Sequence, residues 1–300
     1  MEFQFLKMNT KKFLLNIVFG GCFFIYCLSS CVERIDIRTD NSPPRLIIYG
    51  YITTDTTQHA IRITRSSGFF ETVKPEGISN AVVSISCDER VFELKESAGE
   101  PGLYLTKSDA YGISGKTYTL RVALDFDGDG FIEDYEAKSF LPFPATLDSI
   151  AITTSYFIDD FLQVLIWGNL PEESSNNFSF HLLKNGVVLN DSLRDFLIVR
   201  DDYITNNKIE AMPLFQIDPE GERYNFISGD ILSVQVGSVT SEYAAFIQNA
   251  QQEARGSIPL FSGPPANLET NLRCLSSDSK TGLSGFFTAY SIDRAYTIYE

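Results

Sequence analysis

The residues best suited to chemistry form one short acidic stretch, DFDGDGFIEDYE, which spans residues 125–136. Asp occupies its first, third and fifth positions, Gly its sixth and Glu its twelfth, which is the spacing of an EF-hand calcium loop. Gly130 stands where such a loop needs a residue without Cβ. We expect calcium to take side-chain oxygens, one carbonyl and one water-mediated contact from Asp125, Asp127, Asp129, Phe131 (carbonyl), Glu133 (through water) and Glu136 (bidentate).

The segments on either side of this stretch are typical of strands and not of the two helices of an EF-hand. KTYTLRVAL (116–124) and YEAKSFL (135–141) alternate between apolar and polar residues with a period of two. The sequence therefore predicts a calcium loop inserted into a β-hairpin, with a structural and not a sensory role. The alternative is a solvated acidic loop, in which the crowded carboxylates repel one another when no cation is bound.

Composition narrows the class of protein. The chain has 300 residues, a formal net charge of −15 and a pI near 4.6. Such an acidic chain is a poor partner for nucleic acid, which needs a basic face. The aromatic content of 13%, mostly Phe and Tyr, favours strands.

The first thirty residues have the order of a secretory signal: Lys7, Lys11 and Lys12, then an apolar run, then LSSC ending at Cys31. Met8 is an alternative start. LSSC resembles a bacterial lipobox, so residues 1–30 are predicted to be a lipoprotein signal peptide and Cys31 to carry an N-terminal lipid. A retained membrane anchor is the alternative, although the apolar run is shorter than the ~20 residues a spanning helix needs.

Besides Cys31, two cysteines remain after that signal. Cys87 alternates with apolar residues in AVVSISC and is expected to be a buried hydrophobe. A bridge between Cys87 and Cys274 is open, because an exported compartment permits one.

Turn signals divide the rest of the chain into strands. A linker (31–44) precedes seven expected strands, at 45–52, 58–65, 80–87, 90–96, 102–106, 116–124 and 135–141. This pattern predicts an immunoglobulin-like or transthyretin-like β-sandwich over 45–144. Two prolines in PFPATLDSI (142–150) mark a boundary. A second β-rich domain is expected over 145–300, with strands at 149–157, 161–169, 177–184, 230–240 and 282–299 and one helix over 241–255.

Several segments together resemble a family of Bacteroidota lipoproteins, the domain of unknown function 4249. They are CVERIDI (31–37), PRLIIYGYITTD (44–55), GISNAVVSIS (77–86), GLYLT (102–106), GKTYTLRVAL (115–124), PFPATLDSI (142–150), GDILSVQVGSVTSEYAAFIQ (229–248), PPANLETNLRC (264–274) and GLSGFFTAYS (282–291). The resemblance implies an outer-membrane lipoprotein that works beside a TonB-dependent receptor, and it carries over no catalytic residue. In that family the 125–136 hairpin is usually a short turn, so the acidic loop is a feature of this chain.

Signals for an enzyme are sparse. His59 and His181 are expected to be ordinary strand residues, and the sequence lacks a zinc-protease, nucleophile-elbow or phosphate-loop motif. Two aromatic pairs, Phe69-Phe70 and Phe286-Phe287, are candidates for ligand binding if they stand exposed on loops.

The combined expectation is a non-enzymatic accessory or ligand-presenting partner of a TonB-dependent transporter, held at the outer membrane by the lipid on Cys31. Its periplasmic or outer orientation is left open. The alternative is a calcium-stabilised surface module that binds glycans or peptides. A hydrolase ranks below both.

Overall fold

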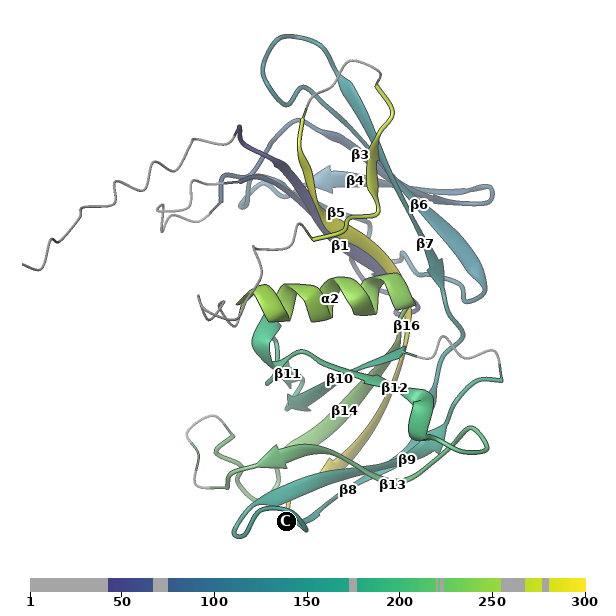
Figure 1. The fold of residues 1–300 in the computed structure, drawn as a ribbon, viewed down its shortest axis with the longest axis vertical. Coiled ribbons are helices and arrows are strands. Elements are labelled where there is room, and N and C mark those ends of the chain that lie inside the picture. The colour runs from purple at the N-terminus through teal and green to yellow at the C-terminus, as the bar shows by residue number, and fades with distance from the viewer. Residues whose placement is uncertain are drawn as a thin grey trace, which may run out of the picture. The chain divides into compact units, whose positions relative to one another are not determined.

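The computed structural model describes residues 43–66, 75–172, 177–219, 221, 224–254, 268–276 and 281–300, all within one compact unit, Pro43–Glu300. Figure 1 shows these residues as a ribbon. The first part contains β1 (Leu46–Thr53), β2 (Ala60–Arg65), β3 (Val82–Cys87), β4 (Arg90–Glu96), β5 (Leu103–Leu105), β6 (Lys116–Leu124) and β7 (Glu133–Leu141). The second contains β8 (Thr146–Thr154), β9 (Leu162–Asn169), β10 (Asn177–Lys184), β11 (Val187–Val188), β12 (Leu197–Arg200), β13 (Lys208–Ile217), β14 (Ile231–Ser238), β15 (Leu272–Cys274) and β16 (Leu283–Ile298), the helix α2 (Ser241–Ala254) and the 3-10 helices η1 (Leu193–Asp195) and η2 (Asp201–Tyr203).

The predicted fold class, mainly β with one α-helix, is confirmed for the described residues. The larger sheet runs in the order β11-β10-β14-β16-β1-β2-β5-β4-β3-β6-β7-β15, with β12 also beside β10. A smaller sheet has the order β13-β9-β8. No helix among the described residues is both long and apolar enough to cross a membrane.

Alternation along the strands builds the first hydrophobic core. In β6, Tyr118, Leu120, Val122 and Leu124 all point inward and are buried, as their period of two predicts. They pack with side chains from β1, β2, β3, β7 and β16. The β6–β7 hairpin that carries the acidic loop is therefore anchored in this core.

β16 links the two parts of the fold. Leu283–Tyr290 pair in parallel with β1, and Ser291–Ile298 pair antiparallel with β14. Figure 1 shows this strand running from the first set of strands into the second. Gly285 lies next to β1 with φ +99°, and a Cβ there would meet the Ile48 carbonyl at 2.1 Å, so this position requires glycine.

The second core lies between the smaller sheet and β10, β14 and β16, and includes Phe178, Phe180, Val164 and Ile217. The helix α2 covers a third cluster, where Tyr243, Phe246 and Ile247 are buried against Phe286 of β16. This is the helix face that the sequence predicts. The Tyr243 hydroxyl lies 2.9 Å from the Tyr49 hydroxyl, and burial raises the pKa of Tyr243 well above its usual value.

The predicted division of the chain at residue 144 needs a correction. The first and second cores do separate along the chain at about this point, but Leu272 of β15 and Phe287 and Ala289 of β16 belong to the first core. Residues 145–300 therefore share their last strands, β15 and β16, with the sheet and core of the first part.

The strands β12, β13 and β15 were not predicted, whereas β11 follows the hairpin signal Asn185-Gly186. In β13, Pro213 and the positive φ of Ala211 interrupt the alternation, and the register against β9 shifts at two points. Pro is tolerated there because β13 is an edge strand. Cys87 is buried as predicted, and the thiols of Cys87 and Cys274 are both free.

The turn between β10 and β11 depends on one carboxylate. Asn185 and Gly186 both have positive φ, as a two-residue hairpin requires. Asp230 accepts hydrogen bonds from the Ile227 N–H at 2.9 Å and the Asn185 side chain at 2.8 Å, and it pairs with Lys184 at 2.9 Å. These contacts, led by the backbone N–H, lower the pKa of Asp230 to about 2.

Replacing this carboxylate should therefore have a pH-dependent effect. Because the folded pKa lies below the ordinary value of 3.8, Asp230 stabilises the fold above pH ~4 and loses this contribution as the pH falls toward 2. We expect Asp230→Asn to lower the melting temperature at pH 7, and the gap from the parent chain to narrow between pH 4 and 2. Asp88→Asn, which removes an exposed partner of Lys116, serves as the control with little effect. A gap for Asp230→Asn that stays constant with pH would contradict this assignment.

Candidate functional site

The acidic loop caps the hairpin between β6 and β7 and is ordered by its own carboxylates. Asp125 accepts hydrogen bonds from the backbone N–H groups of Gly128 at 2.7 Å and Gly130 at 2.9 Å. Asp127 accepts one from Asp129 at 3.3 Å, and Asp129 accepts one from Phe131 at 2.7 Å. The chain therefore coils around the three aspartates, as Asp side chains favour in turns.

Two glycines make this coil possible. Gly128 and Gly130 have φ values of +79° and +86°, and a Cβ at either position would meet nothing within 4 Å. Conformation, and not lack of space, is therefore the reason for glycine at both positions. Gly130 is the residue that the calcium-loop spacing singles out.

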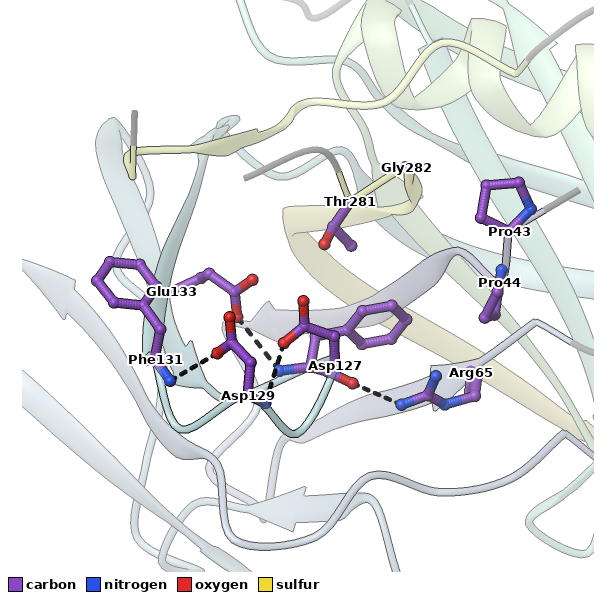
Figure 2. A pocket seen from close by; sticks show the side chains of 10 residues that line it. Pro43, Pro44, Arg65, Asp127, Asp129, Phe131, Glu133, Thr281 and Gly282 are labelled. Atoms are coloured by element: carbon purple, nitrogen blue, oxygen red, sulfur yellow. Dashed lines mark hydrogen bonds between the residues drawn. The ribbon is translucent and has the colours of Figure 1, made fainter. Parts of the chain in front are cut away.

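The loop gathers oxygens into one place. Asp125, Asp127 and Asp129 each offer a carboxylate oxygen, and these three atoms lie within 4.8 Å of one another. Glu133 is buried nearby, where its carboxylate accepts the Phe126 N–H at 3.2 Å. Figure 2 shows the Asp127, Asp129 and Glu133 carboxylates close together on one side of a pocket. This is a hard oxygen donor set of the type that Ca²⁺ takes.

Glu136 does not join this group, so its predicted place as a ligand is wrong. Its carboxylate lies 3.3 Å from Lys138 and 3.6 Å from Arg121, on the face of β7 that points away from Glu133. In an EF-hand the twelfth residue returns to the ion because a helix follows the loop. Here a strand begins at Glu133, and three residues of strand carry Glu136 roughly 10 Å farther along.

A pocket of about 620 Å³ adjoins the loop. Figure 2 shows the loop on one side and Pro43, Pro44 and Thr281 on another. Arg65 of β2 lies between: its guanidinium stacks 4.4 Å from the centre of the Phe126 ring and donates a hydrogen bond to the Phe126 carbonyl. Arg65 thus fixes the second residue of the loop and offsets part of its negative charge. The sequence gives no sign of this contact, because it depends on how β2 lies against the hairpin.

The aromatic candidates do not form an exposed binding face. Phe286 and Phe287 lie in β16, not in a loop, and are only 4% and 0% exposed. Phe287 packs in the first core, and Phe286 packs under Tyr243 and Phe246 of α2. The expectation that these rings stand free on a loop is wrong, because the preceding Gly285 belongs to the strand. Phe69 and Phe70 lie outside the described residues, as does Cys31.

Neither histidine is among the residues that line the pocket beside this loop. His59 is fully buried with its ring edge-on to Tyr51, and burial lowers its pKa. His181 packs edge-on against Phe196 at 4.9 Å, and burial lowers its pKa as well. Both rings serve packing in the part of the chain that the structure describes.

Comparison with known families matches most of the chain. The model of the family "Domain of unknown function (DUF4249)" matches residues 32–295, and the chain therefore belongs to this family. Among curated proteins, none matches the sequence.

Proposed function

We propose that this member of the DUF4249 family is a non-enzymatic lipoprotein of the outer membrane that assists a TonB-dependent transporter. The observation that carries the proposal is LSSC at residues 28–31, which follows a basic and then an apolar segment in the order of a lipoprotein signal. The sequence predicts a linker over residues 31–44 between the lipidated cysteine and the first strand. Family membership supports the same role through the partners that the resemblance implies.

Lipidation has a direct mechanical consequence. Each buried CH₂ contributes about 0.8 kcal/mol, and two or more acyl chains give stable attachment to a membrane. A lipid on Cys31 would hold the protein at the membrane surface. This placement suits a protein that presents a surface or a ligand to a neighbouring transporter.

The experiment is affinity purification of the tagged full chain from detergent-solubilised envelopes, followed by mass spectrometry. We expect a TonB-dependent transporter to co-purify in near-stoichiometric amount, and Cys31→Ser to lose both acyl labelling and most of the co-purified transporter. Cys27→Ser changes a cysteine inside the signal and is the matched control that keeps both. Recovery of the acylated chain without any transporter would count against the partner.

A second candidate is a calcium-stabilised module that binds glycans or peptides at the cell surface. The acidic loop at the edge of the pocket favours it, with Asp125, Asp127, Asp129, the Phe131 carbonyl and Glu133 as the proposed calcium ligands. We assign the ion a structural role, since a strand follows the loop and the described chain has no helix pair there to open. Glycan and peptide arrays probed with and without chelator separate this candidate from the first.

A further inference from the structure

Among the residues that the structure describes, two strand edges in the second part of the fold lie near each other without pairing. β8 is an edge of the smaller sheet and pairs with β9. Residues 291–298 of β16 pair with β14 along one edge. Along the other edge they extend past β1, because the last residue of β1, Thr53, pairs with Tyr290. Leu147 lies beside Asp293, and farther along residues 150–154 lie across from residues 297–300. The two free edges therefore run in the same direction.

The space between these edges is closed at one end and open at the other. At the closed end the Leu147 N–H donates to the Asp293 carboxylate at 2.7 Å, and the Ile292 N–H donates to the Thr54 hydroxyl at 2.9 Å. At the open end a pocket of about 530 Å³ lies between residues 150–154 of β8, Leu162 of β9 and residues 297–300. We call this pocket the strand slot.

Backbone groups of both strands point into the strand slot. The Ser155 N–H donates to Phe161 on the β9 side, and the Tyr299 N–H donates to Asp230 on the β14 side. Because backbone groups in an antiparallel pair alternate between the two edges, those of Ile152, Thr154 and Ile298 are directed the opposite way, toward the slot. An extended polypeptide is the ligand whose own N–H and C=O groups repeat at the spacing of such edges.

The edge of β8 is protected only near its start, where a register shift lies between Leu147 and Ser149 and Asp148 is exposed. Its slot-lining sequence, IAITT (150–154), contains neither Pro nor a charged residue. Exposed apolar side chains stand at this end of the fold, namely Tyr156, Phe157 and Ile158 in the β8–β9 turn and Tyr296 and Ile298 in β16. Large apolar side chains that stay exposed beside an edge strand favour contact with a partner.

The charges beside the strand slot are acidic. Asp159 and Asp160 are exposed in the β8–β9 turn, and Glu300 lines the slot itself. A segment that carries Lys or Arg beyond its apolar residues therefore complements this surface, and an acidic segment is repelled.

We propose that the strand slot receives an extended segment of another protein, which pairs with β8 and β16 as an added strand. The segment has apolar residues at alternate positions, which meet Ile150, Ile152 and Leu162, and basic residues at its ends. Since β8 and β16 run in the same direction, a segment of opposite direction pairs antiparallel with both. This inference needs neither the lipid on Cys31 nor a transporter, so it stands or fails separately from the proposed function.

The test is fluorescence anisotropy of a labelled ten-residue peptide, alternating Val and Thr with two Lys at each end, titrated with the full chain in detergent. We expect saturable binding that is at least tenfold weaker when Glu replaces the four Lys. N-methylation of alternate backbone nitrogens, which removes the donors toward one edge, should weaken binding by a similar factor. Equal binding of the N-methylated and unmodified peptides overturns the proposal.

Two variants of the chain provide an independent check. Thr154→Pro removes an N–H directed at the slot from an exposed edge position, and Ile298→Asn removes an apolar side chain that is 60% exposed. Both should weaken peptide binding without changing the melting temperature by more than a few degrees. Val91→Asn, at a 61% exposed position on β4, is the matched control that leaves binding unchanged.

The remaining outcomes also decide the matter. If Thr154→Pro does not fold, Ile298→Asn and the N-methylated peptide still test the slot. If neither variant weakens binding, the peptide binds elsewhere and the proposal is wrong. Sedimentation can also show a dimer of the chain that Ile298→Asn dissociates. In that case the strand slot pairs with a second copy of this chain, and the proposal of a different partner protein is wrong.

Discussion

Calcium at 100 times its dissociation constant should raise the melting temperature of the full chain by roughly 5–10 °C, which corresponds to about 2.7 kcal/mol of binding linkage for a domain of this size. The physical reason lies in the loop at residues 125–132. Three Asp oxygens lie within 4.8 Å of one another, so a divalent cation bound there would relieve their repulsion. The measurement is thermal unfolding in calcium and in chelator.

Matched substitutions in the same hairpin sharpen this prediction. Asp125→Asn should abolish the calcium-dependent shift in melting temperature. The Asp125 carboxylate accepts hydrogen bonds from the Gly128 and Gly130 N–H groups and so holds the loop in shape. Asp134→Asn is the control, since Asp134 is exposed in the same hairpin and outside the cluster. Glu136→Gln should also keep the shift, because Glu136 pairs with Lys138 and Arg121. If the melting temperature is the same in calcium and in chelator, the loop is not a calcium site.

Phe287→Ala should lower the free energy of unfolding by roughly 3–5 kcal/mol, the usual cost of deleting a fully buried aromatic ring. Phe287 is 0% exposed and lies opposite Gly50 in the parallel pair of β1 and β16. Its backbone is held on the other side by Asn271, which accepts the Phe287 N–H at 3.1 Å and donates to its carbonyl at 2.7 Å. The cavity left by alanine therefore opens where three strands meet and cannot easily collapse.

Phe140→Ala is the control for this prediction, because Phe140 is 45% exposed on β7. Its removal should cost less than about 1 kcal/mol, as surface substitutions usually do. Denaturant unfolding of both variants provides the comparison. If Phe287→Ala lowers the free energy of unfolding by less than about 1 kcal/mol, the ring does not belong to the core. Phe287 would then again be a candidate for ligand binding.

Much of the secondary structure follows from local pattern. The bounds predicted for β4, β6 and β10 coincide with those in the structure, and β6 alternates between buried and less buried residues along most of its length. The helix α2 was likewise predicted from its buried face and from Gly256 beyond its end. β13 was missed because Pro213 and Ala211 disturb the alternation on which such predictions depend.

The candidate site was predictable only in part. Asp125, Asp127 and Asp129 come together as their spacing indicates, because a short loop determines its own geometry. Glu136 was misplaced because the twelve-residue spacing assumes a helix after the loop. Arg65 could not have been found from the sequence, since its stacking on Phe126 joins β2 to a hairpin that lies far away along the chain.

The sequence by itself determined which segments become strands, which one becomes the helix and where the acidic loop stands, because propensity, alternation and turn chemistry act between near neighbours. The tertiary structure decided that β16 pairs with both β1 and β14, that Phe287 is a core residue and that β8 has an edge with no partner strand in the described part of the chain. These outcomes depend on which segments, far apart in the sequence, pack together to bury their apolar side chains. The local sequence pattern of a strand does not specify which distant strand it pairs with.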